Sequence, residues 1–415
     1  YGGAVRRCDQ ETAFQPGTCR RRRAPRRQAA LPRGACMPAT EIGTSERLLE
    51  ELRLWVEMET PTTDAAAVNR LVDRAEAGLR EAGATLERIP GRDGYGDNLI
   101  ARLPGPAGSN RKPVVVCVHL DTVWDNGTLA ASMPFRVEGD KAYGPGIYDM
   151  KSGSFLAFHA VREILRQKVA TRSPVTLIMT PDEEVGSPTS RAIIEREARD
   201  ASAVLIAEPA GGPQGACVTA RKGVGRFVVK VHGISAHAGG NWSEGRSAVV
   251  ALSELVLKVH GLVDLERGVT TNVAPVWGGT RPNVVPPEAG CEIDLRVASE
   301  ADGVAMERAI LALAGERDGI RIEITGGMNR PPMEETAETL RLYETARELA
   351  RQAGYDLPKQ HRGGGSDGNF TAALGIPTLD GLGCTGAGAH APHEHILWRD
   401  LAARGQVLAG LIETL

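Results

Sequence analysis

The sequence predicts an α/β protein that has a central mixed, largely parallel sheet and an inserted α+β unit of the ferredoxin-like type. Three observations lead to this fold class. Strand and helix patterns alternate over residues 85–206, a β-α-β-β-α-β order follows over 225–324, and helices and a strand alternate again towards the C-terminus. A chain of 415 residues has room for roughly two or three domains, so an insertion of this size is reasonable.

The first part of the sheet domain is expected over residues 37–219. An amphipathic helix with a Ser/Thr cap covers 45–58, and a second helix, closed by Gly83, covers 65–82. The Val-rich run at 113–118 is typical of a strand that is buried on both faces. The remaining elements of this part are strands at 85–89, 98–103, 175–179 and 203–206 and helices at 151–167 and 188–197.

The pattern changes near Arg221, and the inserted unit is expected over 220–329. Its elements, in chain order, are a strand at 225–232, a helix at 245–263, strands at 269–276 and 289–297, a helix at 301–314 and a strand at 320–324. Residues 330–415 return to the sheet domain. They are expected to form helices at 338–353, 367–374 and 399–415 and a strand at 376–380.

Residues 1–36, the Arg-rich segment, differ from the rest of the chain. They hold nine Arg and two acidic residues, a net charge of +7, which leaves −10 for the remainder of a chain whose total is −3. We expect this segment to be a disordered basic tail, either non-native sequence ahead of a start at Met37 or an RNA- or membrane-binding arm. The acidic remainder argues against nucleic acid as the main partner.

No apolar run reaches the roughly 18 residues that a membrane span needs, and no apolar stretch follows the basic start as it would in a secretory signal. The protein is therefore expected to be cytoplasmic and to have no membrane partner. The seven Cys include no CxxC pair, which argues against a zinc finger. Four lie in apolar surroundings and are predicted to be reduced core thiols, namely Cys117, Cys217, Cys291 and Cys384; the tail holds Cys8, Cys19 and Cys36.

Five segments carry residues suited to metal chemistry, and each lies where a predicted strand ends or a loop begins. His119 and Asp121 follow the buried Val strand, and their spacing of two places them on one side of an extended segment. His119 either binds a metal while Asp121 orients its ring, or is a satisfied core histidine. Asp149, in a glycine-rich loop, is predicted at the N-cap of the next helix, where it either caps that helix or bridges two metals.

Acidic residues follow two further strands. Asp182, Glu183 and Glu184 form either a solvated turn or an inward-facing set, in which one Glu binds metal and its neighbour acts as general base. Glu208, after the next strand, either caps a loop or supplies another oxygen ligand.

Near the C-terminus, three histidines lie within six residues and form either a polar loop or part of a metal site: His390, His393 and His395. Together, the five segments provide several carboxylates and imidazoles without any Cys. Such a mixed set suits a catalytic divalent ion, zinc or a similar one, rather than structural zinc.

In this order, the segments resemble the family of co-catalytic zinc peptidases and deacylases that includes carboxypeptidase G, aminoacylase, acetylornithine deacetylase and succinyl-diaminopimelate desuccinylase. The likeness runs from about Ser45 to the C-terminus, and the stretch 134–146, PFRVEGDKAYGPG, is particularly similar to carboxypeptidase G. The resemblance implies a zinc-peptidase catalytic domain with an inserted ferredoxin-like lid that also serves for dimerisation. A homodimer is therefore expected.

The resemblance also implies roles for the motif residues. Two Zn²⁺ would be bound, with Co²⁺ or Mn²⁺ as alternatives. Asp149 would bridge both ions, and a cis peptide would follow it. Glu183 would be the general base, and Asp121 would orient His119. The remaining metal ligands implied are His119 and Glu208 for one ion and Glu184 and His390 for the other.

Further family positions fall in the inserted unit and in a late loop. Residues 235–239, SAHAG, are similar to a family segment whose His, here His237, reaches the partner subunit's site and steadies the oxyanion. Asn283 and Arg296 match positions that hold substrate. His237 could instead be an ordinary loop residue, and Arg296 part of a strand salt bridge. The loop GGGSD resembles one whose backbone N–H groups face the substrate carboxylate, at Gly364, Gly365 and Ser366.

The implied function is hydrolysis of an amide bond next to a free carboxylate. The leading interpretation is a glutamate carboxypeptidase that acts on short peptides or folate-type N-acyl glutamates. Residues 219–223, TARKG, look more like the deacylase branch of the family, so an N-acyl-amino-acid deacylase is the alternative. An inactive metal-binding scaffold and an RNA-binding protein that acts through the Arg-rich segment are more remote alternatives.

Overall fold

The computed structural model describes residues 38–415. The expectations for the Arg-rich segment, and for Met37, Cys8, Cys19 and Cys36, lie outside the described residues. The four cysteines of the described part are buried and free, as predicted. Across this part, no helix combines the length and the apolar character needed to cross a membrane.

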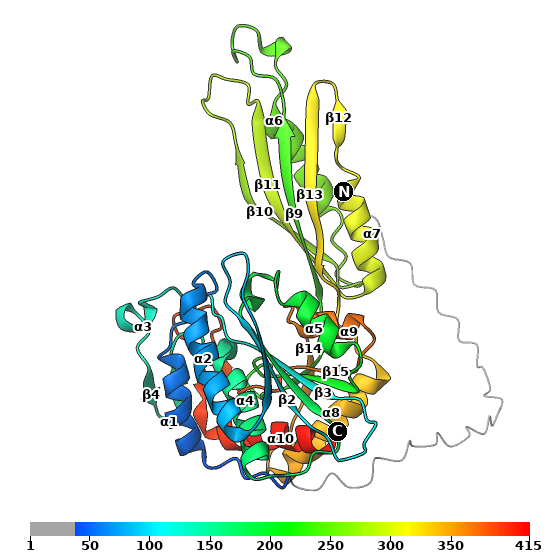
Figure 1. Cartoon of the computed structure of the whole chain (residues 1–415). Coiled ribbons are helices and arrows are strands. Elements are labelled where there is room, and N and C mark those ends of the chain that lie inside the picture. The colour runs from blue at the N-terminus through cyan, green and yellow to red at the C-terminus, as the bar shows by residue number, and fades with distance from the viewer. Residues whose placement is uncertain (1–37) are drawn as a thin grey trace, which may run out of the picture. The chain divides into compact units, whose positions relative to one another are not determined.

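The central sheet contains six strands in the order β1-β2-β6-β3-β7-β15 (Figure 1). β3 pairs in parallel with β6 and β7, and β15 extends the parallel part by pairing with β7. At the other edge, β2 runs antiparallel to both of its neighbours, β6 and β1. The predicted mixed, largely parallel sheet is therefore confirmed. The strands are β1 (Thr85–Ile89), β2 (Asn98–Leu103), β3 (Val114–His119), β6 (Val175–Thr180), β7 (Ala203–Ile206) and β15 (Thr378–Leu379).

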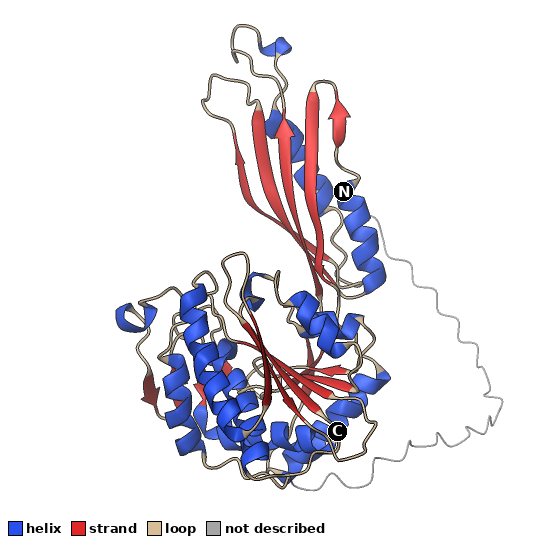
Figure 2. Ribbon diagram, viewed as in Figure 1, coloured by secondary structure: helices blue, strands red, loops and turns tan. Residues whose placement is uncertain are grey.

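Helices cover both faces of this sheet (Figure 2), because alternate residues of each strand point to opposite sides. In β3, Val114, Val116 and Val118 belong to the larger apolar core, and Val115 and Cys117 belong to a smaller core on the other face. All of β3 is buried, as its Val run predicted. The larger core includes α1 (Ser45–Val56), α2 (Ala65–Ala82), α4 (Ser152–Arg166), α8 (Ala337–Gln352) and α10 (Leu401–Thr414); the smaller includes α5 (Arg191–Ala198) and α9 (Gly368–Ala373).

Local signals set several helix ends where the sequence placed them. The Thr44 side chain caps α1, and Asp64 caps α2 by accepting a hydrogen bond from the backbone N–H of Ala67. Gly83 closes α2 in the left-handed conformation, with a φ of 97° that other residues adopt only under strain.

The inserted unit contains a five-stranded antiparallel sheet in the order β10-β11-β9-β13-β12. The first four strands have the order of a ferredoxin-like unit, so that prediction is confirmed, and β12 is an additional edge strand. In β9, buried residues alternate with exposed ones, so one face packs against helices and the other meets solvent. The elements are β9 (Gly223–His232), α6 (Ala248–His260), β10 (Thr270–Gly278), β11 (Glu288–Val297), α7 (Glu300–Leu311), β12 (Gly315–Arg317) and β13 (Ile320–Arg330).

Several short elements were not predicted, because their sequences carry too little periodic pattern. One further sheet has four strands and another has two. The four-stranded sheet contains β4 (Arg136–Glu138), β5 (Lys141–Tyr143), β16 (Gly386–Ala387) and β17 (His395–Leu397); the other contains β8 (Cys217–Arg221) and β14 (Lys359–Arg362), and α3 (Thr128–Ala131) is a single turn.

One element end differs from prediction in a way that affects the site. The strand predicted at 320–324 continues as β13 to Arg330. Gly326 and Gly327 look like a strand end in the sequence, but Gly326 takes a φ of 116° and the pairing with β9 continues past both. The longer strand brings Arg330 to the central domain.

Gly153 lets α4 approach the end of β7, and its replacement is expected to be costly. A Cβ at Gly153 would overlap the carbonyl oxygen of Ala207, the residue before Glu208. We expect Gly153→Ala to lower the free energy of unfolding by about 3 kcal/mol, since overpacking outweighs the gain of about 1 kcal/mol in helix propensity. Denaturant unfolding measures this change. Gly303→Ala in α7 is the matched control, because its nearest atoms lie at an ordinary 3.5 Å, and it should not destabilise the fold.

Candidate metal centre and active site

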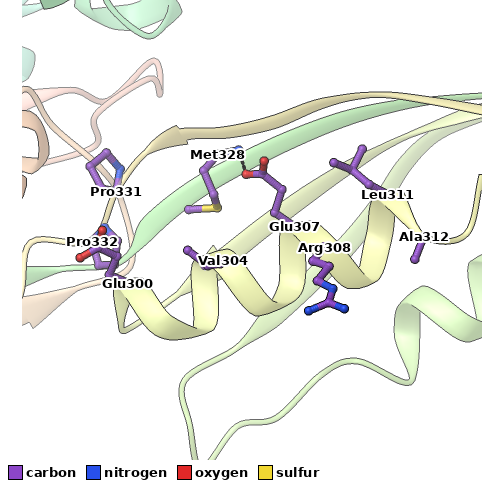
Figure 3. A pocket seen from close by; sticks show the side chains of 10 residues that line it. Glu300, Val304, Glu307, Arg308, Leu311, Ala312, Met328, Pro331 and Pro332 are labelled. Carbon is purple, nitrogen blue, oxygen red and sulfur yellow. Dashed lines mark hydrogen bonds between the residues drawn. The ribbon is translucent and has the colours of Figure 1, made fainter.

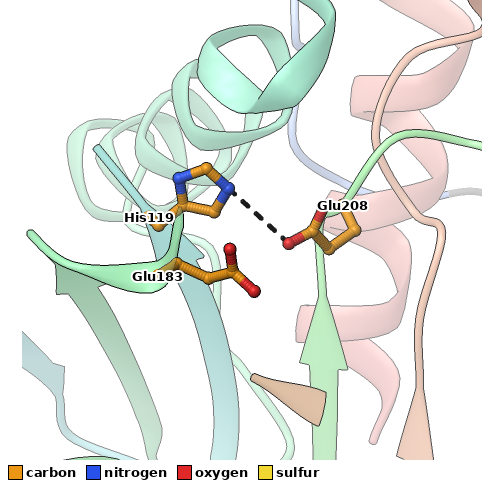
Figure 4. Close-up of side chains that lie close together, drawn as sticks. All are labelled: His119, Glu183 and Glu208. Atoms are coloured by element: carbon orange, nitrogen blue, oxygen red, sulfur yellow. Dashed lines mark ion pairs between the residues drawn. The ribbon is translucent and has the colours of Figure 1, made fainter. Parts of the chain in front are cut away.

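Three acidic or imidazole side chains come from neighbouring parallel strands of the central sheet. His119 is the last residue of β3, and Glu183 and Glu208 lie just after β6 and β7. Because β6, β3 and β7 are adjacent and parallel, their carboxyl ends meet at one edge of the sheet. Figure 4 shows the three side chains directed toward a common space.

His119 is buried and faces carboxylates on both ring nitrogens. Its Nε2 lies 3.5 Å from Asp149 Oδ1 and 3.6 Å from Glu208 Oε1. Its Nδ1 lies 3.0 Å from the backbone oxygen of Asp121 and 3.4 Å from Asp121 Oδ1. Burial lowers the pKa of His119, but these contacts outweigh burial and raise the pKa well above its usual value.

Asp149 faces a second imidazole with its other oxygen. His390 Nε2 lies 3.3 Å from Asp149 Oδ2 and 3.1 Å from Glu184 Oε2. These two carboxylates raise the pKa of His390 to about 10. Asp149 therefore stands between His119 and His390. His395, by contrast, lies in β17, where its ring is directed to the backbone oxygen of His393 at 2.8 Å.

The predicted N-cap position of Asp149 is wrong, and with it the capping alternative. The segment Ile147–Lys151 forms a π-helical turn in which Asp149 has non-helical backbone angles, and α4 begins only at Ser152. The Asp149 side chain is thereby free to face the two imidazoles. The cis peptide expected after Asp149 is present between Asp149 and Met150.

Asp121 contacts more than the His119 ring. Its Oδ1 accepts a hydrogen bond from the backbone N–H of Glu183 at 3.2 Å, and its Oδ2 accepts one from that of Glu184 at 3.2 Å. The Thr62 hydroxyl donates to the same Oδ2 at 2.7 Å. One buried carboxylate thus fixes the position of the Glu183–Glu184 pair as well as contacting His119.

Glu394 holds the loop that carries Asp149. Its carboxylate accepts hydrogen bonds from the backbone N–H groups of Gly146 at 3.0 Å, Tyr148 at 2.8 Å and Asp149 at 3.0 Å. The indole of Trp124 donates to it at 2.7 Å. Sequence analysis did not identify Glu394, because the backbone groups that it holds lie about 245 residues earlier.

Glu183 lies beside this cluster and pairs with an arginine that the sequence did not identify. Burial raises the pKa of Glu183 to about 8, although Arg330 and His119 oppose the rise. Arg330 Nη2 donates to Glu183 Oε1 at 2.9 Å. The only sequence signal for Arg330 is its place at the predicted boundary between the inserted unit and the last part of the sheet domain.

The donor set fits divalent cations. Two groups have ligand atoms within 4.8 Å of one another, one made of His119, Glu183 and Glu208 and the other of His119, Asp149 and Glu184. Within the described residues, His119 Nε2 and Glu184 Oε1 are buried without a hydrogen-bond partner, a costly state that a cation would relieve. His390 belongs to neither group, but its contacts to Asp149 and Glu184 place it with the second.

His237 and Asn283 lie together in the inserted unit. The backbone N–H of Ala238 donates to the Asn283 backbone oxygen at 3.0 Å, and His237 pairs with Val284. His237 Nδ1 accepts hydrogen bonds from two backbone N–H groups of its own loop. Over the described part of the chain, the hydrogen bonds of these two residues do not involve the metal-ligand cluster.

Arg296 forms the strand salt bridge that the sequence left open as an alternative. Its Nε and Nη2 donate to the two oxygens of Asp294 at 2.7 and 2.8 Å. Its Nη1 reaches the backbone oxygen of Gly363 at 3.5 Å. Arg296 is therefore at the glycine loop, with one side of its guanidinium already paired.

The glycine loop is held from within, and this corrects the expectation for Ser366. Arg221 Nη1 donates to the backbone oxygens of Gly364 and Gly365. Ser366 is fully buried; its backbone N–H donates to the Asn369 side chain, and its hydroxyl donates to the Asp380 carboxylate. Ser366 thus has no donor left for a substrate, and the substrate-binding roles of Gly364 and Gly365 stay predictions.

A separate cavity of about 600 Å³ runs along α7 (Figure 3). It is lined mainly by apolar atoms, including those of Val304, Leu311 and Met328. None of its lining residues belongs to the predicted site, so its size does not bear on the chemistry of the metal-ligand cluster.

Raising the pH from about 6 to about 9 is expected to destabilise the metal-free protein. Burial raises the pKa of Glu183 to about 8 and that of Glu208 well above its usual value, so the fold favours their protonated forms and loses stability as they ionise. His390, with its pKa raised to about 10, contributes stability below its unfolded value of about 6.5 that is likewise lost as it deprotonates.

Bound cations would supply the positive charge that these protons provide. The gap in Tm between metal-loaded and chelator-treated protein should therefore widen over this pH range. Thermal unfolding at a series of pH values measures the gap, and a constant or narrowing gap would contradict the prediction.

The chain is similar to known proteins in sequence and in fold. The sequence model described as "Peptidase family M20/M25/M40" matches residues 115–414. Carboxypeptidase G2 from a Pseudomonas species is 33% identical over 350 residues, or 83% of this chain and 83% of that protein. A putative succinyl-diaminopimelate desuccinylase from Mycobacterium tuberculosis is 28% identical over 330 residues, or 75% of this chain and 83% of that protein. The crystal structure of aminopeptidase PepT from Bacillus cereus shares the fold, with a TM-score of 0.74 at 23% identity over 90% of this chain and 99% of that one.

Proposed function

The chain belongs to peptidase family M20/M25/M40, and on that premise we propose that it is a glutamate carboxypeptidase, which releases C-terminal glutamate from short peptides or folate-type N-acyl glutamates. Membership of this family makes the chain a metal-dependent hydrolase. The observation that carries the proposal is the placement of Asp149 between His119 and His390, with Glu183 beside them. The similarity to carboxypeptidase G2 supports the choice of glutamate.

Two divalent cations, zinc in the first instance and cobalt or manganese as alternatives, would share Asp149. When bound, they would lower the pKa of water and polarise the substrate carbonyl. The residues that would hold them are His119, Asp149 and Glu208 for one and Asp149, Glu184 and His390 for the other. Asp121 would act through His119 and through the Glu183–Glu184 backbone.

Glu183 would be the general base. Its carboxylate would accept a proton from the attacking water and return it to the leaving nitrogen as the amide bond breaks. In the metal-free protein, burial raises the pKa of Glu183 to about 8, so this carboxylate holds a proton more strongly than an exposed one does. His237 of the partner subunit would steady the oxyanion.

Substrate selection would rest on groups that favour a free carboxylate. Arg296, already anchored by Asp294, presents its remaining donors at the glycine loop, where Gly364 and Gly365 turn their carbonyl groups toward Arg221. In a trans peptide the N–H of the next residue is opposite the carbonyl, so the N–H of Gly365 faces away from Arg221 and would be available to an anion. Asn283 would add a contact from the inserted unit.

A deacylase is the second candidate function. The TARKG segment at 219–223 and the similarity to a desuccinylase favour it. In the structure, Arg221 of this segment is buried in a two-point ion pair with Asp380 beneath the glycine loop.

The test is a panel of N-acyl amino acids and folate-type C-terminal glutamates, with product release followed by chromatography with and without a chelator. Chelator-sensitive release of glutamate from the folate-type members would support the carboxypeptidase. Preferential cleavage of acetyl or succinyl amides would establish the deacylase instead. No hydrolysis by protein that carries its metal ions would contradict both and favour an inactive scaffold.

The inserted unit would form the homodimer. β10 lies at an edge of its sheet, and apolar side chains on or near β10 and α6 are exposed, including Leu257, which is 72% exposed, and Val276. A second copy of the chain at this edge would pair with the free side of β10 and would cover the exposed apolar side chains.

Leu257→Glu is therefore expected to shift the protein to monomers in sedimentation analysis. If His237 acts in the partner's site, turnover should fall with the dimer while metal content stays unchanged. Val304→Glu on α7, an apolar position that is 66% exposed, is the control and should stay dimeric. A dimeric Leu257→Glu protein would contradict this placement of the interface.

A further inference from the structure

Arg330 is carried by the inserted unit, but its side chain lies in the catalytic site. It is the last residue of β13 and follows a break in the pairing register with β9 at Met328. Only 5% of its side chain is exposed. An arginine this deeply buried needs partners for its charge, and one of its partners is Glu183, the general base of the proposed reaction.

The guanidinium is shared between two carboxylates. Nη2 donates to Glu183 Oε1 at 2.9 Å and to the Glu183 backbone oxygen at 3.1 Å. Nη1 donates to Asp367 Oδ1 at 3.0 Å, and Nη2 also contacts the Ser187 hydroxyl at 3.1 Å. Arg330 therefore holds Glu183 at two points, its carboxylate and its own peptide.

The surroundings fix the guanidinium in place. It lies over the ring of Phe370, with its central carbon 4.7 Å from the ring centre. A Cβ at Gly365 would come within 2.7 Å of Arg330 Cδ, so only glycine at 365 leaves room for the stem. Any shift of Arg330 would have to displace either the ring or the glycine loop.

Glu183 has two possible uses at this position. Its ligand atom lies within 4.8 Å of those of His119 and Glu208, so it could serve as a further metal ligand. A general base must instead keep an oxygen for the proton that it accepts. The hydrogen bond from Arg330 to Oε1 occupies one carboxylate oxygen and restrains the side chain, which leaves Oε2 as the oxygen that can accept a proton.

We propose that Arg330 is a positioning residue that keeps Glu183 in the general-base position and out of the metal coordination. This inference rests on the proposed function of Glu183. It differs from a role in substrate recognition, because the donors of Arg330 that have a partner are directed to the chain's own groups.

The test compares Arg330→Ala with the parent protein loaded with Co²⁺, whose visible absorption reports the ligands of the ion. The variant is expected to bind the same number of ions with an altered spectrum, because Glu183 becomes free to coordinate. The double variant Arg330→Ala/Glu183→Gln should regain the parent spectrum. In steady-state kinetics, kcat should fall by about 10²-fold with KM changed little.

The matched control is Arg191→Ala. Arg191 lies over the same Phe370 ring at 4.8 Å and donates to the Asn329 backbone oxygen, but it pairs with Glu195 and not with Glu183. It should keep the parent spectrum and kcat. Arg330→Lys is the second variant, for the case in which Arg330→Ala does not fold. Lys keeps the charge but cannot reach both carboxylates, so kcat should fall at least about tenfold.

An unchanged cobalt spectrum in Arg330→Ala, or an Arg330→Lys protein with the parent kcat, would overturn the proposal. A rise in KM with kcat preserved would also overturn it, because it would make Arg330 a substrate-binding residue. Failure of the proposed function gives a different result: Glu183→Gln alone would retain turnover, whatever the Arg330 variants do.

Discussion

Glu183→Gln is expected to bind its full set of divalent cations and to lose turnover by about 10²- to 10⁴-fold, the usual contribution of a positioned general base. Gln keeps the shape of Glu and its hydrogen bond with Arg330, but it cannot accept the proton from water. The proposed ligands, His119, Asp149, Glu208, Glu184 and His390, remain untouched. Steady-state kinetics and elemental analysis of metal per chain measure the two parts of this prediction.

The matched control for this change is Glu195→Gln in α5. Glu195 pairs with Arg191 at the surface and makes no contact with the metal-ligand cluster. The same chemical change there should leave turnover unaltered. If Glu183→Gln kept turnover near that of the parent, Glu183 would not be the base.

Asp149→Asn is expected to have a larger effect, because it should release metal as well as abolish turnover. Asp149 presents one oxygen to His119 and the other to His390, so each proposed ion depends on it. An Asn side chain offers a single oxygen and an NH₂ group that repels cations. The loss of metal affinity should exceed the roughly 10- to 100-fold that accompanies loss of a group that only supports a ligand.

Isothermal titration with Zn²⁺ or Co²⁺ measures this loss. Asp64→Asn is the control, since Asp64 caps α2 and Asn is an equally good capping residue. It should bind metal as the parent does. Two tightly bound ions in Asp149→Asn would show that Asp149 does not bridge them.

Much of the fold was predictable because its signals are local. The Val run of β3 needs only its own composition, and the glycine after α2 marks the end of that helix. The spacing of His119 and Asp121 is likewise readable, since two residues apart on an extended segment means the same side. The short strands of the two smaller sheets carry no such signal, and they depend on partners far along the chain.

The site was predictable in its ligand types but not in its supports. Arg330 and Glu183 are hydrogen-bonded although 147 residues separate them in the sequence, and no local pattern near either residue predicts this contact. The cap predicted at Asp149 failed for a related reason, because an acidic residue before a helix looks the same whether the helix starts there or three residues later. Ser366 was predicted to bind substrate because it follows the glycines of the loop. In the structure its backbone N–H donates to Asn369 and its hydroxyl donates to Asp380.

The hydrogen bonds of Asp121 and Glu394 have a consequence for how the protein exchanges its ions. In small zinc domains the ion itself gathers the ligands, and removing it unfolds the chain. Here the chain's own N–H groups hold the Glu183–Glu184 turn and the Asp149 loop. We therefore expect the protein to stay folded when its metal ions are removed, and to bind a different divalent metal without unfolding first.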